Sequence, residues 1–407
     1  MYFYAARQPI LDIDKKLFAY ELLFRDSIDN VFPEVDADEA TTRMIEASNF
    51  NIGLSEFTGN KPAFINFTLD TLCKGYPETL SPEEVVIEIL ETVKPGRKLL
   101  EICQSLHKKG YVIALDDYIH HSVWRYFYPF IKIIKIDWQD TPIETIISVK
   151  EAIIDFPHIK LLAEKVETYE EYNQALELGF ELFQGFFFAK PEMVKTKSLS
   201  PSQIAMAELL YETSKPDLDL TSITSVFERD ITLSYKLLQY ANSPIFLRRN
   251  EISTIKQALV ILGSGELKRF LGLMFATNVN PNKPSELINS AMTRAKFLEL
   301  TAKNINVPLD PSIAFLTGLL SLIDAIVDEN LDSILVKLPL AQEIKDTLLT
   351  RKGVMAGLIK LVEFIERAEW HKTSILMEKL EVEKSIVVCN YNQAIIWADE
   401  QSNTESN

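Results

Sequence analysis

In the first half of this chain, one apolar segment after another ends in an acidic or amide residue. A buried strand is stabilised by Val, Ile, Leu and Phe. A carboxylate at its end does not stabilise the strand unless the carboxylate is solvated, paired or bound to a cation. A series of such segments, separated by helix-like stretches, predicts a barrel whose strand ends converge on one polar site. The segments are ELLFR at 21–25, FINFT at 64–68, VVIEILE at 85–91, VIALDD at 112–117, IIKID at 133–137, LLAEKVET at 161–168 and LFQGFFFAKP at 182–191.

Strand-like segments with helical segments between most of them predict an α/β fold, a (β/α)8 TIM-like barrel. The first two strands are joined only by the polar stretch 12–16, which is too short for a parallel crossover. We therefore expect one antiparallel strand in an otherwise parallel barrel. Helices are predicted at 37–57, 95–109, 142–155 and 168–178, and strands at 2–5, 17–24, 62–67, 84–90, 111–116, 131–137, 159–164 and 181–184.

The pattern changes after Pro191, where strand signals disappear and apolar residues recur at helical spacing up to about residue 370. This change predicts that an all-α helical domain follows the barrel. We expect a barrel domain at 1–192, a helical domain at 198–370 and a C-terminal extension at 371–407. The polar end of the extension, ADEQSNTESN, is expected to be disordered.

The composition restricts the partners of the chain. Its 407 residues are 47% hydrophobic and 25% charged, which predicts a sizeable core, and the net charge is −16. An acidic surface disfavours nucleic-acid polymers and anionic membranes, because binding to either requires basic surface. Three widely spaced cysteines, the lack of a signal-peptide pattern and the lack of a membrane-spanning apolar run predict a cytoplasmic location.

The residues at the strand ends have the chemistry of a two-metal site. Hard cations such as Mg²⁺ and Mn²⁺ take oxygen ligands and leave positions open for phosphate and water. Asp116 and Asp117 repel each other unless positive charge lies beside them, and Lys135 adds a charge that could hold a water or a phosphate oxygen. Alternatively, each acid is an ordinary solvated strand end, and Lys135 forms a local ion pair with Asp137. The candidate ligands are Glu21, Asn66, Glu88, Asp116, Asp117 and Glu164.

Taken in order, the motifs of residues 1–192 resemble those of the EAL domain, whose members hydrolyse the bacterial second messenger cyclic di-GMP. The variant YELLFR, joined to a helical second half, resembles the EAL–HDOD proteins of the YuxH type. The motifs are ELL followed by Arg25, then Asn66, Glu88 with Glu91, the pair Asp116–Asp117, KID at 135–137, AEKVE at 163–167 and QG at 184–185.

The resemblance implies a role for each matching residue. It assigns Lys135 to orienting the attacking water, and it makes Glu164 the candidate general base as well as a metal ligand. It implies two Mg²⁺ or Mn²⁺ ions, the first held by Glu21, Asn66, Glu88 and Asp116 and the second by Asp116, Asp117 and Glu164. Gln8, Arg25 and Gln184 would contact substrate or line its pocket. Glu91, Asp137 and Glu167 would contact the residues that bind metal or substrate.

One stretch departs from the family pattern. The family continues the Asp pair as DFGTGYSS, whereas this chain reads DDYIHHSVWRY at 116–126, without either glycine. A solvated loop or a helix start explains His120 and His121 better than metal ligation does. The leading function is a metal-dependent phosphodiesterase that opens cyclic di-GMP to linear pGpG. The alternatives are a catalytically silent cyclic di-GMP receptor and a protein-interaction scaffold that binds no nucleotide.

The helical half has motifs of its own. LSYKLLQYANSP at 233–244 and IKQALVILG at 255–263 resemble the HDOD domain, a helical relative of HD-type hydrolases, over about 198–370. HD hydrolases bind metal through helical histidines, but His371 is the only histidine of this half, and Ser321–Leu322 stand at the expected His-Asp position. The resemblance implies a signalling module with an unknown protein partner. The alternative is a helical domain that merely packs on the barrel.

Overall fold

The computed structural model describes residues 4–25, 54–190, 209, 219–229, 231–242, 252–278, 283–337 and 340–404. The chain divides into two compact units that alternate along the sequence. The barrel unit comprises the chain up to Lys190 together with Pro284–Glu286 and Glu363–Met377, and the helical unit comprises the rest. The predicted linear boundaries at 192, 198 and 370 do not include this alternation, and they stay a prediction.

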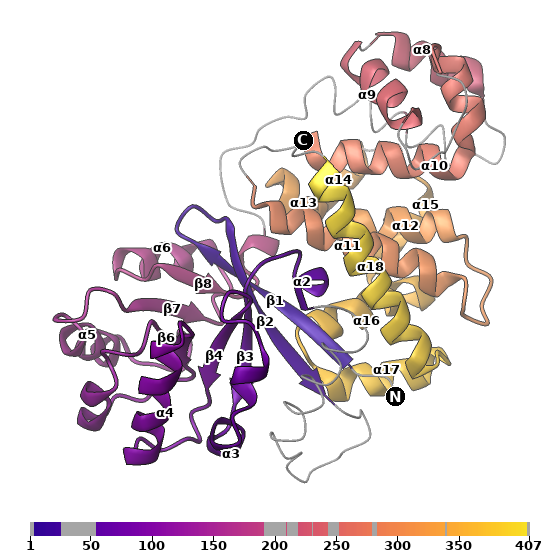
Figure 1. Ribbon diagram of the computed structural model, residues 1–407. Coiled ribbons are helices and arrows are strands. Elements are labelled where there is room, and N and C mark those ends of the chain that lie inside the picture. Colours follow the sequence, from indigo (N-terminus) through magenta and orange to yellow (C-terminus); the bar gives the residue numbers. More distant parts are fainter. Residues whose placement is uncertain are drawn as a thin grey trace. The chain divides into compact units, whose positions relative to one another are not determined.

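Eight strands close into a barrel in sequence order, with the first strand pairing with the last (Figure 1). The first strand is antiparallel to both of its neighbours, and every other pair is parallel. The predicted barrel with one reversed strand is therefore confirmed. The strands are β1 (Tyr4–Asp12), β2 (Leu17–Arg25), β3 (Ala63–Phe67), β4 (Val85–Ile89), β5 (Val112–Leu115), β6 (Ile133–Asp137), β7 (Lys160–Glu164) and β8 (Leu182–Gln184).

A tight turn between β1 and β2 reverses the chain. The Asp12 carboxylate accepts hydrogen bonds from the backbone N–H groups of Asp14 and Lys16, both at 2.9 Å, and such local bonds stabilise turns. The prediction that the first strand ends at residue 5 is wrong, since β1 continues to Asp12. Strand β1 pairs with β2 along most of its length and with β8 at its end. This pairing overrides the weak strand preference of the polar residues in β1.

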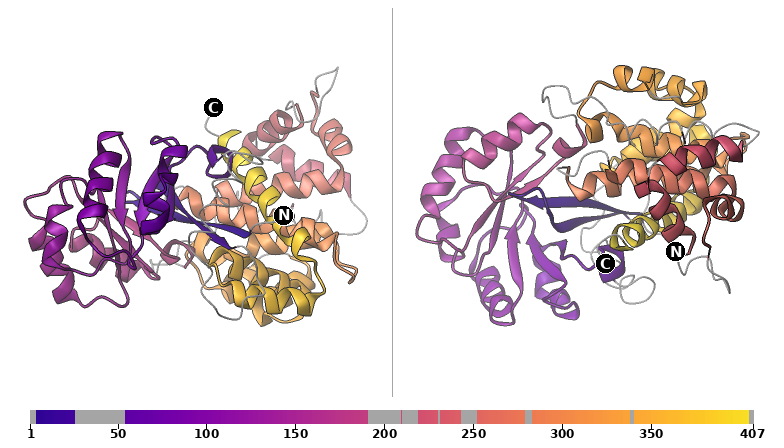
Figure 2. Two further views of the ribbon diagram at one scale, coloured as in Figure 1. Left: turned by 60° about the horizontal axis from the view of Figure 1, so that its bottom comes forward. Right: turned by 90° about the horizontal axis from the view of Figure 1, so that it is seen from above.

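Helices connect the parallel strands and lie on the outside of the barrel (Figure 2). Three of them, α4 (Arg97–Lys108), α5 (Ile143–Ala152) and α6 (Tyr169–Glu177), fall within the predicted ranges. The predicted helix at 37–57 lies outside the described residues except for α2 (Leu54–Phe57). The shorter elements are α3 (Leu69–Cys73) and the 3₁₀ turns η1 (Tyr76–Thr79), η2 (Ser122–Tyr126) and η3 (Phe187–Ala189).

An apolar layer crosses the barrel interior, with one buried side chain from each strand. Side chains alternate along a strand, so residues two positions apart both face the interior. The layer therefore forms a floor beneath the interior residues nearer the carboxyl ends of the parallel strands. Its members are Ile10, Ala19, Phe64, Val86, Ala114, Ile133, Leu162 and Leu182.

The described chain after residue 219 is helical, which confirms the predicted all-α region. None of the described helices combines the length and the apolar composition needed to cross a membrane. The elements are α8 (Leu220–Arg229), α9 (Ile231–Ala241), α10 (Ile255–Asn278), α11 (Ser285–Ala302), α12 (Pro311–Leu319), η5 (Leu320–Leu322), α13 (Ile323–Val327), α14 (Leu331–Lys337), α15 (Gln342–Thr350), α16 (Gly353–Glu366), α17 (Trp370–Leu380) and α18 (Lys384–Thr404).

The segment Glu363–Met377, which includes the end of α16 and the start of α17, belongs to the barrel unit. The Gln8 side-chain amide donates a hydrogen bond to the Glu366 carbonyl at 3.4 Å. The Arg367 guanidinium lies over the Phe186 ring, 4.9 Å from its centre, a favourable cation–π distance.

The polar end of the chain is helical up to Thr404, so the prediction of disorder is wrong for residues 398–404. Ala394, Ile395 and Ala398 recur at helical spacing and are at most 1% exposed. Asp399 accepts a hydrogen bond from the Asn289 amide at 2.8 Å. Tertiary packing of this face therefore stabilises a helix that local composition alone does not.

Candidate active site

A second ring of interior residues lies next to the apolar floor. In each strand, or just after it, the ring residue is two sequence positions from the floor residue. In β2 to β8 the ring residue follows the floor residue along the sequence. In the reversed β1 it precedes the floor residue, as Gln8 precedes Ile10. Every residue of this polar ring is among the site residues predicted from the sequence. The polar ring consists of Gln8, Glu21, Asn66, Glu88, Asp116, Lys135, Glu164 and Gln184.

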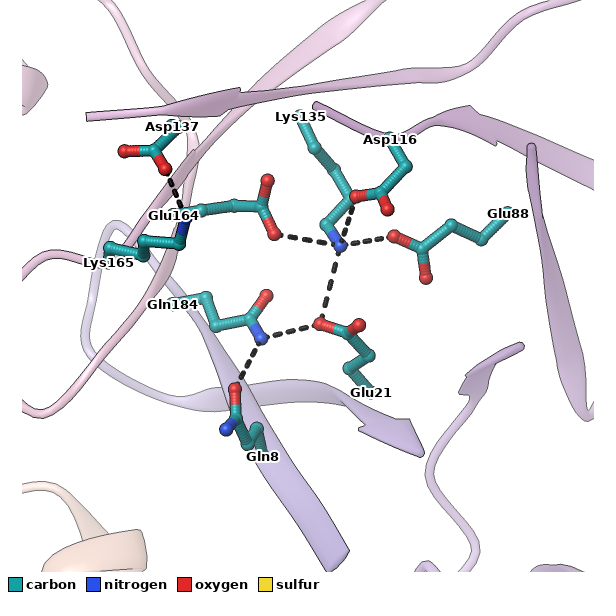
Figure 3. A network of polar contacts seen from close by, with 9 residues as sticks. All are labelled: Gln8, Glu21, Glu88, Asp116, Lys135, Asp137, Glu164, Lys165 and Gln184. Carbon is teal, nitrogen blue, oxygen red and sulfur yellow. Dashed lines mark hydrogen bonds and ion pairs between the residues drawn. The ribbon is translucent and has the colours of Figure 1, made fainter. Parts of the chain in front are cut away.

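The ammonium group of Lys135 lies among four carboxylates of the polar ring (Figure 3). The Lys135 side chain is fully buried. Burial alone would lower the pKa of Lys135, but the surrounding negative charges outweigh it and raise the pKa well above its ordinary value. Its Nζ atom lies 2.8 Å from Glu164 Oε1, 3.0 Å from Asp116 Oδ1 and 3.3 Å from Glu21 Oε2, and it also donates to Glu88.

These carboxylates carry more negative charge than one lysine neutralises. Burial raises the pKa of Glu164 to about 8, with Asp116 and Glu21 adding to the increase against the opposing effect of Lys135. Burial likewise raises the pKa of Glu88 well above its ordinary value. An additional cation would stabilise carboxyl groups with such raised pKa values, because a cation favours their charged form.

Several oxygen atoms of the polar ring are available to such a cation. Glu88 Oε2 and Glu164 Oε2 are buried, and neither has a hydrogen-bond partner within the described residues. Asp116, Asp117 and Glu164 each place one carboxylate oxygen within 4.8 Å of the others. Hard divalent cations prefer carboxylate and carbonyl oxygens. The donor set therefore fits a divalent metal ion.

Gln184 connects the first two strands of the barrel to the last. Its side-chain amide donates to Glu21 Oε2 at 2.6 Å and to Gln8 Oε1 at 3.0 Å (Figure 3). Gln184 is only 4% exposed, so these bonds are shielded from competing water. They hold the Glu21 carboxylate toward the centre of the polar ring.

Asp137 does not pair with Lys135, so the alternative of a local ion pair between them is wrong. Asp137 pairs with Lys165, the residue that follows β7 (Figure 3), while Lys135 faces the carboxylates of the polar ring. The motif AEKVE contains Lys165, but nothing in the sequence indicates that it reaches across to β6, and the sequence reasoning missed it. Asp117 follows the polar ring directly, is exposed, and has a positive φ of 37°.

Three other predicted site residues lie away from the Lys135 cluster. Glu91 is exposed in the turn after β4. Glu167 accepts from Lys190 Nζ at 3.0 Å, at a half-exposed position. Arg25 ends β2, and its side chain lies outside the described part of the structure.

The altered stretch after the Asp pair is tied to the barrel. The Tyr118 backbone N–H donates to the Lys135 carbonyl at 3.0 Å. The Tyr118 hydroxyl lies 2.8 Å from that of Tyr128 and 3.2 Å from His120 Nδ1. His121 caps η2 by accepting from the Val123 N–H at 3.3 Å, in line with the expected helix start. The stretch is therefore an anchored loop rather than a glycine hinge.

The position expected for a His-Asp pair in the helical unit is occupied by other contacts. Ser321 is 4% exposed, and its hydroxyl donates to the Gly318 carbonyl at 2.7 Å. The Arg294 guanidinium donates to the same Ser321 oxygen at 3.3 Å. Burial raises the pKa of the nearby Asp324. These contacts form a polar cluster inside the helical unit.

Comparisons with known proteins match both halves of the chain. The EAL domain model matches residues 10–191, and the HDOD domain model matches residues 200–330. The cyclic di-GMP phosphodiesterase CdgJ of Vibrio cholerae is 38% identical, covering 90% of this chain and 85% of that protein. The uncharacterized protein YuxH of Bacillus subtilis is 34% identical, covering 97% of both chains. The crystal structure of an EAL domain protein from Listeria monocytogenes is 20% identical, covers 46% of this chain and 87% of that one, and has a TM-score of 0.37.

Proposed function

The chain belongs to the family of EAL–HDOD proteins, and we propose that its barrel hydrolyses cyclic di-GMP to linear pGpG. The observation that carries this proposal is the polar ring, in which carboxylates from four strands surround Lys135. The relative CdgJ, which matches most of the chain, is named a cyclic di-GMP phosphodiesterase. An interior that holds both acids and a lysine suits hydrolysis of a phosphodiester.

The metal ions of this reaction would be Mg²⁺ or Mn²⁺. The first would be held by Glu21, Asn66, Glu88 and Asp116, and the second by Asp116, Asp117 and Glu164. When bound, such ions lower the pKa of water and stabilise charge on phosphate oxygens. The free oxygens of Glu88 and Glu164 support this assignment, as does the proximity of Asp117 to the second group.

The protein's own residues would move the protons. Hydrolysis breaks the bond between phosphorus and the 3′ oxygen, and it places the water oxygen on phosphorus. Glu164 would accept the proton of the attacking water through the oxygen that Lys135 does not contact. Lys135 would hold the water or a phosphate oxygen with its ammonium group, and the departing 3′ oxygen would take a proton from solvent.

Incubation of the pure protein with cyclic di-GMP and Mn²⁺ or Mg²⁺, followed by separation of the nucleotides, tests the proposal. We expect pGpG from the wild type and at least a hundredfold lower rate from Glu164→Gln, about the contribution of a general base. Asp155→Asn, which alters an exposed acid paired with Arg125, serves as the control. A wild type that releases no pGpG with either metal would refute hydrolysis.

A receptor without catalysis remains the second candidate function, and the anchored loop favours it. Glycine permits close backbone approach to a phosphate, whereas this loop is held by the contacts of Tyr118. Tight binding of intact cyclic di-GMP without product would identify the receptor. For the helical unit we propose a partner-binding role, since its sequence lacks the histidines of an HD-type metal site.

A further inference from the structure

Lys165 has an unusual backbone conformation at the edge of the polar ring. It follows Glu164 directly, and its φ is 56°. This is the left-handed region, which residues other than glycine adopt only at a cost in conformational energy. Asp117, which belongs to the same group of acids as Glu164, has a φ of 37°. A non-glycine residue keeps such a conformation only where the surrounding structure holds it.

Contacts on two sides fix Lys165 in this position. Its ammonium pairs with Asp137 Oδ2, while Asp137 Oδ1 accepts from the backbone N–H groups of Gln139 at 2.8 Å and Asp140 at 3.0 Å. The Gln139 side chain in turn donates to the Lys165 carbonyl at 3.1 Å. Asp137 and Gln139 thus position both the side chain and the backbone of Lys165.

The ammonium of Lys165 is accessible, in contrast to that of Lys135. The Lys165 side chain is 56% exposed, whereas that of Lys135 is 0% exposed and faces four carboxylates. An ammonium group has three N–H donors, and a single carboxylate oxygen of Asp137 engages one of them. Lys165 can therefore contact a further anion without breaking its ion pair.

We propose that Lys165 binds a non-bridging phosphate oxygen of the cyclic dinucleotide and sets the affinity of the barrel for it. This inference rests on the proposed function, because it identifies a contact to the same substrate. The reason is electrostatic: the chain has a net charge of −16, so an accessible cation beside the polar ring attracts a phosphate that the rest of the surface repels. Lys165, held beside Glu164 by its pairing with Asp137, supplies positive charge at the edge of the polar ring.

Steady-state kinetics and nucleotide binding of Lys165→Met test this assignment. We expect the KM for cyclic di-GMP to rise about tenfold or more, as for loss of a charge-assisted hydrogen bond, with kcat changed less than twofold. The KM of the wild type should rise more steeply with salt than that of the variant, because salt screens the charge of Lys165, which only the wild type carries. Lys165→Arg should retain most of the wild-type affinity.

Two further variants separate charge from structure. Lys160→Met removes the half-exposed lysine at the opposite end of β7, whose ion pair with Glu181 measures 3.4 Å, and should leave the KM unchanged. Lys165→Gly removes the charge and relieves the left-handed backbone, so the KM should rise while the melting temperature does not fall below that of Lys165→Met.

Each outcome is decisive. A wild type that turns over, with an unchanged KM in Lys165→Met, overturns the inference and leaves the hydrolase intact. A wild type that binds cyclic di-GMP without turnover, with weaker binding in Lys165→Met, supports the inference and overturns hydrolysis. A wild type that neither binds nor cleaves the dinucleotide overturns both.

Discussion

Glu164 contacts Lys135 with one carboxylate oxygen, 2.8 Å from Nζ, and its other oxygen is buried without a hydrogen-bond partner in the described structure. The two oxygens therefore have different surroundings. The first is neutralised by the ammonium group, and the second is left for a proton or a cation. Burial without a partner makes this second oxygen the one on which a metal ion or a proton would act.

Removing the central ammonium should destabilise the metal-free protein. Lys135→Met is expected to lower the free energy of unfolding by about 3–5 kcal/mol, because it leaves buried carboxylates without their cation. Urea unfolding in the presence of a chelator measures the effect, and added Mn²⁺ should restore part of it, since a ligand of the native state stabilises that state. Lys160→Met, on the protein surface, should stay within about 0.5 kcal/mol of the wild type. Equal losses in both variants would contradict a central role for Lys135.

Asp116 should be needed for metal affinity, because it belongs to both proposed ligand groups. Asp116→Asn is expected to weaken Mn²⁺ binding at least about tenfold, equivalent to about 1.4 kcal/mol, with the fold retained. Titration calorimetry gives the affinity, and Asp155→Asn serves as the matched surface control. Unchanged Mn²⁺ affinity in Asp116→Asn would remove this residue from the metal site.

The stability of the metal-free protein should fall as pH rises from about 5 to about 8. The pKa of Glu164 is raised from its ordinary 4.5 to about 8 in the folded chain, so over this range the folded chain keeps a proton that the unfolded chain has lost. The resulting stabilisation is complete below the unfolded pKa and is lost as pH rises through the folded one. Denaturation in chelator at several pH values measures it. Glu164→Gln should flatten the dependence, and an equal slope in wild type and variant would show that another group is responsible.

Most of the polar ring could be predicted from the sequence, because an acid at the end of an apolar strand is costly without a function. The antiparallel first pair could also be predicted, since the linker between the two strands is too short for a crossover. The extent of β1 could not, because its hydrogen bonds come from β2 and β8 rather than from local preference. Likewise, the pair Lys165–Asp137 depends on the register of β6 beside β7, and the helical end of α18 depends on packing by residues such as Ala398.

The glycine after Gln184 should be intolerant of substitution. Gly185 has a φ of 145°, and an added Cβ would lie 2.0 Å from the Val166 carbonyl oxygen. Gly185→Ala is therefore expected to lower the free energy of unfolding by about 2–4 kcal/mol, as for other severe backbone or packing conflicts. The control is Gly265→Ala, two residues after the break that Gly263 makes in α10. Nothing lies within 4 Å of an added Cβ there, so the free energy of unfolding should change by at most about 0.5 kcal/mol. Urea unfolding compares the two, and a smaller loss in Gly185→Ala than in its control would contradict the close approach.

The alternation of the two units along the chain limits how this protein can be divided. A fragment that stops at Lys190 lacks Glu363–Met377, which belongs to the same compact unit, and it loses the carbonyl of Glu366 that Gln8 of the polar ring contacts. Expression of the isolated barrel would thus produce a catalytic fragment with a missing piece rather than a complete module. Exchange of the helical half between relatives, by recombination or by design, would likewise need to carry residues that complete the barrel of the recipient.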